Sequence, residues 1–261
     1  MNKKLPLIAF FDLDGTLAVG NEPPAQADID AIRAFRRDGN YAFLCTGRSR
    51  GYLYDAVTDI GFDGIVCGAG TYVTVGDTVL YRACVDDQTL DRALHAFENA
   101  PFTLIMETER TMVQLVGDGS GKVVPTYPRI LSADDWHTRY ADETVSKFTI
   151  YGTPLPPSLL AVFDGYHIIE HPTYYEMVPL GCSKSNGIRR VIEHLNLPQE
   201  NVLAFGDSPN DRDMIEFAGY GVVMGDGDPA IQALADFVTL PLADCGVAHA
   251  LSRIMTNDKS T

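Results

Sequence analysis

Two aspartates separated by one residue, Asp12 and Asp14, come directly after the apolar run Leu7-Ile8-Ala9-Phe10-Phe11. An apolar run of this length predicts a buried strand, and in open α/β sheets chemistry gathers outside the carboxyl ends of such strands. Gly15 follows at once and lets the turn close tightly, so both carboxylates could approach one ligand. A solvated acidic turn is the simpler alternative, because Asp and Gly are common in turns for conformational reasons.

Polar residues also follow a second and a third expected strand. Thr46-Gly47-Arg48 comes after the strand expected at 41–45, where a hydroxyl and nearby amides could hold an anion. Asp207, Asn210 and Asp211 come after the strand expected at 201–205 and offer the hard oxygen ligands that Mg²⁺ prefers. The alternative for this last group is an N-capped helix start, which Ser208-Pro209 would supply without a metal.

Lys184 begins a helix expected at 184–196 and would bring a cation to the same sheet edge. A lone lysine at a helix start is usually solvated, because lysine is mostly exposed in proteins. All four signals nevertheless occur in order, each beside an expected parallel strand.

Together these segments resemble the ordered four-motif signature of the haloacid dehalogenase-like superfamily, and the layout is most similar to its Cof-like sugar-phosphatase subgroup. The motifs that carry the resemblance are Asp12-Leu13-Asp14-Gly15-Thr16, Thr46-Gly47-Arg48, Lys184, and Gly206-Asp207 with Asn210-Asp211. The resemblance implies an α/β fold in which a Rossmann-like parallel-sheet core carries an inserted α+β cap domain.

The resemblance also implies roles for single residues. Asp12 would be the nucleophile that forms an aspartyl-phosphate, and Asp14 would be the general acid/base. Thr46 and Lys184 would hold the phosphoryl oxygens, and Gly47 and Asn210 would complete the phosphate-binding loop. The chemistry is consistent, because a carboxylate can attack a phosphate dianion only when cations neutralise the charge.

A Mg²⁺ site is implied by the same resemblance. Asp207 would ligate Mg²⁺ together with the Asp12 carboxylate and the Asp14 backbone carbonyl, and Asp211 would support that site. No His or Cys stands beside these residues in the sequence, and such an all-oxygen set favours Mg²⁺ over zinc.

The domain boundaries follow from two alternating β/α segments that enclose a different middle. Residues 1–81 and 181–261 are expected to form the two parts of the core, and residues 82–180 the cap. The expected core elements are strands at 7–11, 41–45, 64–67, 201–205 and 220–224, and helices at 25–38, 50–60, 184–196 and from Pro209 and Pro229 onward. The expected elements of the middle are strands at 78–85, 102–108, 111–117, 145–151, 166–171 and 174–179, and helices at 88–99 and 156–163.

A cap in this position would close over the substrate and select the leaving group. Residues that could line its pocket are aromatic, basic or histidine side chains that are equally consistent with packing: Tyr127, Arg129, Trp136, His137, Tyr140, Tyr174 and Tyr175. His167 and His171 flank a strand-like run and are interpreted as structural. Two segments depart from the Cof-like pattern, Cys67-Gly68-Ala69-Gly70-Thr71 and Met224-Gly225-Asp226-Gly227, so Thr71 and Asp226 receive no role.

Composition limits the partners. The formal net charge of −15 and a pI near 4.6 disfavour nonspecific nucleic-acid binding. No 18-residue apolar span and no secretory leader is apparent, which predicts a cytoplasmic protein without a membrane partner. The five cysteines are widely spaced and indicate neither a disulfide framework nor a zinc site. We expect a monomer or a weak homodimer that acts on a small phosphorylated metabolite.

The leading hypothesis is a Mg²⁺-dependent phosphoric monoester hydrolase acting on small metabolites, sugar phosphates first. A sugar phosphomutase would use the same nucleophile and return the phosphoryl group to a sugar hydroxyl. A non-catalytic sugar-phosphate sensor on the same fold is the third reading, because fold does not determine function. Asp12 and Asp14 are both present, which favours an enzyme.

Overall fold

The computed structural model describes residues 5–258, which form two compact units. The core unit contains residues 5–47, 53–81 and 183–258, and the cap unit contains Arg48–Tyr52 and Arg82–Cys182. The short segment Arg48–Tyr52 had been expected in the core, yet its contacts group it with the cap unit. The chain therefore passes between the units at 47/48 and 52/53 as well as at the two ends of the inserted segment.

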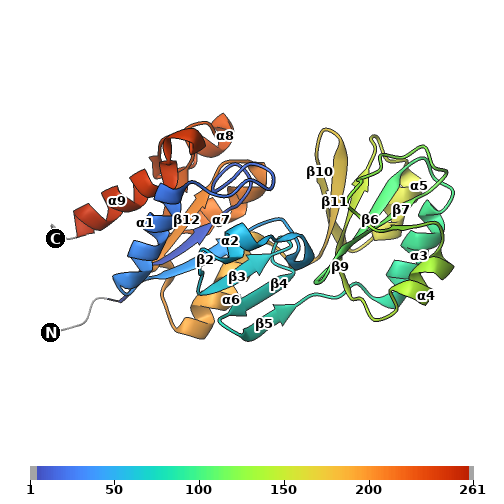
Figure 1. Cartoon of the computed structure of the whole chain (residues 1–261), viewed down its shortest axis with the longest axis horizontal. Coiled ribbons are helices and arrows are strands. Elements are labelled where there is room, and N and C mark those ends of the chain that lie inside the picture. Colours follow the sequence, from blue (N-terminus) through green and yellow to red (C-terminus); the bar gives the residue numbers. More distant parts are fainter. Residues whose placement is uncertain (1–4, 259–261) are drawn as a thin grey trace. The chain divides into compact units, whose positions relative to one another are not determined.

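An eight-stranded sheet forms the centre of the core unit, with strand order β14-β13-β12-β1-β2-β3-β4-β5 (Figure 1). The strands from β14 to β3 are parallel, and β4 runs antiparallel to β3. Their bounds are β1 Ile8–Phe11, β2 Tyr41–Cys45, β3 Gly64–Cys67, β4 Tyr72–Val75, β5 Thr78–Arg82, β12 Val202–Gly206, β13 Tyr220–Val223 and β14 Phe237–Val238. β1 lies between β12 and β2, so three of the expected catalytic segments leave neighbouring strands at the same sheet edge.

Helices cover both faces of this sheet. Alternate residues of β1 point to opposite sides: Ala9 and Phe11 pack with α1, α2 and α9, while Ile8 and Phe10 pack with α6, α7 and α8. The helix bounds are α1 Gln26–Arg37, α2 Asp55–Thr58, α6 Lys184–Leu195, α7 Arg212–Phe217, α8 Pro229–Gln232 and α9 Gly246–Asp258. Short 3₁₀ helices occupy η3 Gln199–Asn201, η4 Pro209–Asp211 and η5 Leu242–Asp244. This three-layer arrangement confirms the predicted Rossmann-like core.

The cap unit has a six-stranded sheet with order β10-β11-β9-β6-β7-β8 (Figure 1). Its strands are antiparallel except for the short β7–β8 pair. The strands are β6 Thr103–Thr108, β7 Met112–Val116, β8 Arg129–Ile130, β9 Val145–Tyr151, β10 Tyr166–Glu170 and β11 Tyr174–Pro179, and the helices are η1 Arg50–Tyr52, α3 Asp87–Phe97, α4 Ala133–Arg139, α5 Pro157–Leu160 and η2 Ala161–Phe163.

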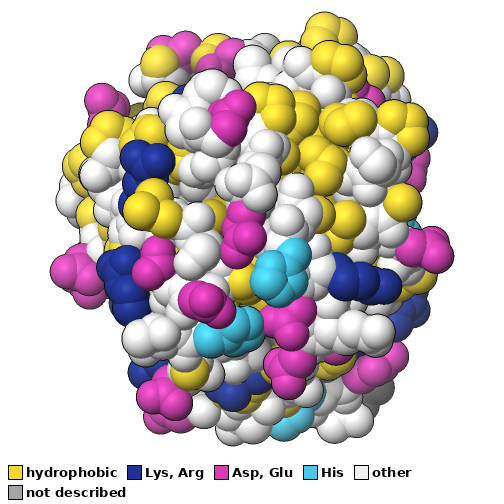
Figure 2. Space-filling view, turned by 90° about the vertical axis from the view of Figure 1, so that its right-hand side faces the viewer, with side chains coloured by type: hydrophobic (Ala, Val, Ile, Leu, Met, Phe, Trp, Pro, Cys, Tyr) yellow, Lys and Arg dark blue, Asp and Glu magenta, His cyan; other side chains and the backbone are white. Residues whose placement is uncertain are grey.

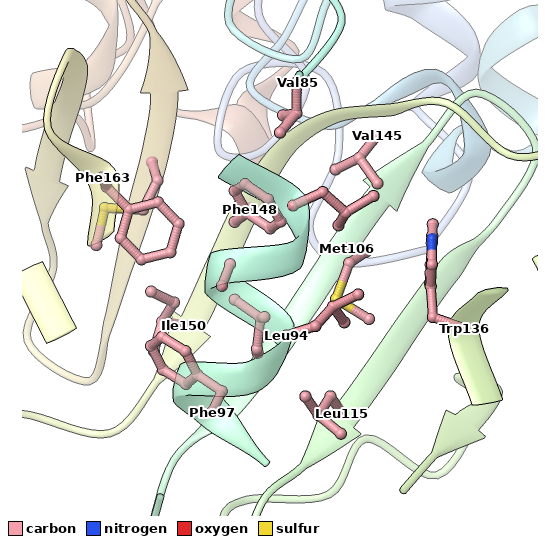
Figure 3. Packing of buried hydrophobic residues seen from close by; sticks show 14 of the residues in the cluster. Val85, Leu94, Phe97, Met106, Leu115, Trp136, Val145, Phe148, Ile150 and Phe163 are labelled. Atoms are coloured by element: carbon pink, nitrogen blue, oxygen red, sulfur yellow. The ribbon is translucent and has the colours of Figure 1, made fainter. Parts of the chain in front are cut away.

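The helices of the cap unit pack on one face of its sheet. Leu94 and Phe97 from α3 and Trp136 from α4 meet Met106 and Phe148 from the strands in one continuous apolar cluster (Figure 3). On the face shown in Figure 2, acidic and histidine side chains lie next to one another, and hydrophobic side chains gather above them. The helical face therefore provides the hydrophobic core of the unit, and the opposite face of the sheet is left for other contacts.

Several elements differ from the expectations. The helix expected at 50–60 is two short pieces, η1 and α2, and the strand expected in the insert at 78–85 is β5 of the core sheet. Five strands and α-helices were not predicted, namely β4, α4, β8, β14 and α9, and neither were the 3₁₀ helices η3 and η5. Short strands and a helix with exposed polar residues carry weak periodicity, and their neighbours in the sheet or core decide their conformation. No described helix has the length and apolarity that spanning a bilayer requires.

A buried carboxylate links the first and last helices of the core unit. Asp28, in the first turn of α1, has no exposed surface, and its Oδ1 accepts a hydrogen bond of 2.7 Å from the backbone N–H of Ala248 near the start of α9. Its Oδ2 is buried without a hydrogen-bond partner. Burial raises the pKa of Asp28, and the Ala248 N–H opposes that effect only in part.

The loop between β3 and β4 contains an alanine in an unfavourable conformation. Ala69 has φ of 54°, a left-handed backbone that costs an alanine roughly 1–2 kcal/mol because its Cβ approaches the following carbonyl. The Ala69 N–H donates to the carbonyl of Thr46 at 3.1 Å, and Gly70 packs closely against the backbone of Ser183. The neighbours of the loop therefore hold Ala69 in this conformation.

We expect Asp28→Asn to gain stability relative to the parent protein as pH rises. A carboxyl whose folded pKa lies above its unfolded value stabilises fully below the unfolded pKa, and that stability is lost as pH rises through the folded pKa. Asparagine keeps the acceptor for Ala248 and carries no charge. Denaturant unfolding of both proteins between pH 4 and 7 measures the difference, with Asp30→Asn on the same helix as the matched control. A difference that stays constant with pH would contradict the role given to Asp28.

Ala69→Asn should raise the free energy of unfolding by about 0.5–1 kcal/mol, because Asn tolerates the left-handed region better than Ala. The melting temperature should rise by a few degrees, since about 1 kcal/mol corresponds to roughly 2–4 °C in a protein of this size. Ala27→Asn on the exposed side of α1 is the control and should lose stability, because Asn is a weaker helix former than Ala. Equal losses in both variants would show that Ala69 is not strained.

Candidate active site

Asp12 and Asp14 stand on a tight turn at the carboxyl end of β1. The N–H of Asp12 donates to the carbonyl of Phe205 on β12, and Thr16, Leu17 and Ala18 all donate to the carbonyl of Leu13. The turn buries the Asp12 side chain to 3% exposure and leaves the Asp14 side chain exposed. The two carboxylates therefore lie in different environments, one buried and one in contact with solvent.

Gly15 is required where this turn meets the segment after β12. Its φ is 87°, and a Cβ at this position would collide with the carboxylate of Asp207. The neighbouring Thr16 Oγ1 donates to Asp207 Oδ1 at 3.2 Å. The first and fourth motifs are therefore in direct contact, and Thr16 is a positioning residue to which the sequence analysis gave no role.

Lys184 forms the central ion pair of the site. Its Nζ lies 2.5 Å from Asp12 Oδ1 and 2.5 Å from Asp211 Oδ1, and all three side chains are almost completely buried. Burial lowers the pKa of Lys184, but the two carboxylates outweigh that effect and hold it well above its usual value. The lysine is therefore a permanent cation, and the alternative of a solvated helix-start lysine is wrong for this residue.

Two helix starts position these charges. Ser183 caps α6 by accepting the N–H of Asn186, which places Lys184 in the first helical turn. Asp211 Oδ2 accepts the N–H groups of Asp207 and Ser208 in a capping box at η4. Asp211 thus uses one oxygen to hold the loop and the other to hold the lysine. The predicted N-cap at Ser208 is present, so the capping alternative and the charged site coexist.

Asp12, Asp207 and Asp211 form an acidic cluster whose ligand atoms all lie within 4.8 Å of one another, the one such group among the described His, Cys, Asp and Glu residues. Burial and then Asp211 raise the pKa of Asp12 well above its usual range, and the same causes raise that of Asp207 to about 7. When all three carboxylates are ionised, the single ammonium leaves two negative charges uncompensated. A divalent cation ligated by carboxylate oxygens fits this set in charge and in donor type.

The remaining predicted residues line the same sheet edge. Thr46 follows β2, is buried, and has its N–H bonded to the carbonyl of Val66 on β3. The backbone of Gly47 approaches the amide of Asn210, because a Cβ there would lie 3.7 Å from Asn210 Nδ2. Asn210 itself is exposed and accepts a hydrogen bond from Ser208 Oγ at 2.7 Å. The second and fourth motifs are therefore adjacent at one edge.

The two segments without an assigned role also reach this edge. Thr71 is buried, and its Oγ1 has no hydrogen-bond partner in the described chain. Asp226 accepts the N–H of Leu242 at 3.1 Å, while Asp228 donates its N–H to the carbonyl of Asp207. The loop that carries Asp226 thus supports the backbone of Asp207.

The predicted cap residues separate into three groups. Trp136 and Tyr175 are buried in the apolar cluster, and Tyr140 packs against it. Arg129 and His137 are exposed, and His137 lies 2.9 Å from Asp91. Tyr127 and Tyr174 are half-buried, and Tyr127 meets Tyr52 edge-on. The sequence did not single out Lys147, a buried cation of the cap unit, because an isolated lysine in a strand gives no signal of burial.

Comparison with known proteins agrees with this geometry. A family model described as haloacid dehalogenase-like hydrolase matches residues 9–251. The chain is 27% identical over 254 residues to a putative phosphatase, YkrA, of Bacillus subtilis, covering 95% of this chain and 97% of that protein. It is 36% identical over 278 residues to the 5-amino-6-(5-phospho-D-ribitylamino)uracil phosphatase YitU of the same organism, covering 94% and 96%.

Solved structures agree on the fold. A hypothetical protein from Geobacillus kaustophilus superimposes with a TM-score of 0.83 at 25% identity and covers 96% of this chain and 99% of that one. The predicted fold class and the prediction of an enzyme are confirmed by these comparisons. The ordered motifs, their meeting at one sheet edge and the family match lead to one conclusion: the chain belongs to the haloacid dehalogenase-like hydrolases.

Proposed function

We propose that the protein is a Mg²⁺-dependent phosphatase that hydrolyses small phosphorylated metabolites with hydroxyl-bearing leaving groups through an aspartyl-phosphate on Asp12. The observation that carries the proposal is the buried Asp12 carboxylate, oriented by Lys184 and adjacent to Asp207 and Asp211. Relatives named as phosphatases support the reaction class. The name of YitU specifies a phosphorylated ribityl compound, which supports a polyhydroxylated leaving group.

Mg²⁺ fits the donor set of the acidic cluster. Asp12 and Asp207 would hold it, with the backbone carbonyl of Asp14, and Asp211 would fix the loop that presents Asp207. When bound, the ion supplies positive charge that lowers the repulsion between a carboxylate and a phosphate dianion. Asp211 is better suited to positioning than to ligation, because both of its oxygens already accept hydrogen bonds.

The residues of the chain divide the remaining work. Asp12 attacks phosphorus, and the ester oxygen of the leaving group departs as the new oxygen–phosphorus bond forms. Lys184, with Thr46 beside the same edge, neutralises and holds the phosphoryl oxygens. Asp14, exposed at the turn, protonates the departing oxygen and then takes the proton of the water that hydrolyses the acyl phosphate.

Removal of the metal should abolish the phosphatase activity. We expect EDTA to abolish phosphate release from p-nitrophenyl phosphate and from a sugar phosphate, and excess Mg²⁺ to restore it, because without the ion the acidic cluster lacks the positive charge that a phosphate dianion requires. Phosphate release and sugar-phosphate isomerisation are measured together, so that a phosphomutase would be recognised. Full activity in EDTA, or rescue by Zn²⁺ and not by Mg²⁺, would contradict the assignment.

The Asp12→Asn and Asp14→Asn variants should lose catalytic activity in different ways. Asp12→Asn removes the nucleophile and should abolish turnover of every ester without a trapped phosphoenzyme. Asp14→Asn should lower kcat/KM for a sugar phosphate by about 10²–10⁴-fold and that for p-nitrophenyl phosphate much less, because nitrophenolate leaves without a proton.

The kcat/KM ratio in this test reports phosphoryl transfer to the enzyme and is insensitive to slow later hydrolysis. Phosphoenzyme should also accumulate in Asp14→Asn with the activated ester. Equal losses of kcat/KM on both esters would remove the general-acid role from Asp14 and leave it as a positioning residue.

A further inference from the structure

Three arginines of α1 line an open cavity on the surface of the core unit. Arg33, Arg36 and Arg37 surround a volume of about 410 Å³ together with Ile60, and this space is called the arginine cavity below. Residues three and four positions apart on a helix are neighbours on its surface, so the three guanidinium groups reach the same space. The chain has 20 basic residues against 35 acidic ones, so three cations around one cavity run against its overall charge.

Internal hydrogen bonds hold two of these guanidinium groups in place. Arg33 Nε and Nη2 donate to the backbone carbonyls of Ile60 and Asp59 at 3.2 and 2.8 Å. Arg36 makes a paired contact with Asp63, in which Nε lies 2.9 Å from Oδ2 and Nη2 lies 2.5 Å from Oδ1. Because the chain itself fixes these side chains, an anion that enters the cavity would not have to order them.

Arg33 and Arg37 carry the positive charge that remains uncompensated, whereas the charge of Arg36 is balanced by its carboxylate partner. Within the described residues, Arg33 donates to carbonyl groups alone, and Arg37 makes no ion pair. The neighbouring carboxylates of Asp38 and Asp59 are exposed and pair with neither arginine. Like charges four positions apart on a helix repel each other, so an anion between Arg33 and Arg37 would relieve an unfavourable arrangement.

The arginine cavity lies at the edge of the core sheet that is opposite to the active site. Arg37 ends α1, and β2 begins shortly after it at Tyr41, which is the register partner of Ile8 at the start of β1. Asp63 directly precedes β3. The amino ends of the parallel strands therefore meet here, whereas Asp12 follows the carboxyl end of β1. An anion in this cavity is thus separate from the substrate of the proposed reaction.

We propose that the arginine cavity binds a small phosphate-bearing anion with at least two negative charges, such as a diphosphate group. The guanidinium group presents paired N–H donors that match phosphate oxygens, and two uncompensated guanidinium groups match two charges. The net charge of −15 repels long polyanions such as nucleic acids, whereas a compact anion can approach the arginines alone. The proposal is independent of the proposed function, because it concerns binding without turnover.

Calorimetric titration of the metal-free full chain with pyrophosphate at low ionic strength tests the proposal. Arg37→Gln should raise the dissociation constant about 10-fold or more, because hydrogen bonds between charged groups are lost. Arg37 has no ion-pair partner among residues 5–258, so the substitution breaks no internal salt bridge. The matched control is Arg253→Gln on α9, an exposed arginine that lies over the ring of Phe237, and it should change the constant by less than about twofold.

Thermal unfolding provides a second readout of the same binding. A ligand that binds only the folded state raises the melting temperature, so pyrophosphate should raise that of the parent protein and of Arg253→Gln. The increase should be much smaller for Arg37→Gln. Arg37→Lys keeps the charge and loses the paired donors, so its dissociation constant should lie between those of the parent protein and Arg37→Gln.

Three results would overturn the proposal. Pyrophosphate could produce neither heat nor a change in melting temperature, or the parent protein and Arg37→Gln could bind it equally well, and the arginine cavity would then not be its site. Citrate could bind at least as tightly as pyrophosphate, which would replace the phosphate class by a carboxylate. Arg37→Gln could lower kcat/KM for p-nitrophenyl phosphate in Mg²⁺ by more than about twofold, which would contradict a site separate from catalysis.

Discussion

The Lys184 ammonium between Asp12 and Asp211 is the interaction on which the active site depends. It joins the start of α6 to the end of β1, 172 residues away in the chain, and to η4, 27 residues away. Removing the lysine would leave buried carboxylates without their partner, and breaking a buried ion pair in this way costs roughly 3–5 kcal/mol in proteins. The same lysine that pairs these buried carboxylates also orients Asp12, the nucleophile of the proposed reaction, and places a positive charge beside it.

The parallel sheet makes this meeting possible. β1, β2 and β12 are neighbours, so the residues that follow them emerge at one edge, and the turn after β1 lies against the loop after β12 through Gly15 and Thr16. The net charge of −15 repels anions, so the protein can bind a phosphate only where positive charges are concentrated. Lys184 supplies one cation, and the excess of carboxylates supports the proposed Mg²⁺ as another.

The alternation of side chains along its strands gives the sheet of the cap unit two different faces. Side chains that point to the helices form one apolar cluster around Phe148 and Trp136 (Figure 3). Side chains that point the other way include the buried Lys147 and its two glutamates. Among them, Glu107 accepts a hydrogen bond from Ser49 Oγ, which attaches Arg48–Tyr52 to the sheet. One face therefore provides the hydrophobic core of the unit, and the other holds its buried charges.

The sequence by itself determined the order of the chemical groups and the class of the fold. Apolar runs followed by Asp12, Thr46 and Asp207 identify parallel strands and their ends, because burial on both faces needs continuous apolar residues. Local signals also placed the helix starts at Ser208 and Asp228, where side-chain acceptors precede proline. The short elements β4, β8 and α4 were not predicted, because their conformation follows from long-range packing and not from local periodicity.

Only the tertiary structure decided which charges are partners. Nothing in the spacing of Lys184 and Asp211 shows that they touch, and nothing around Lys147 shows that it is buried between Glu107 and Glu176. The assignment of Arg48–Tyr52 to the cap unit likewise depends on the bond from Ser49 to Glu107, across 58 residues. Such contacts depend on distance in space and on desolvation, and both arise only when strands from distant parts of the chain pair in one register.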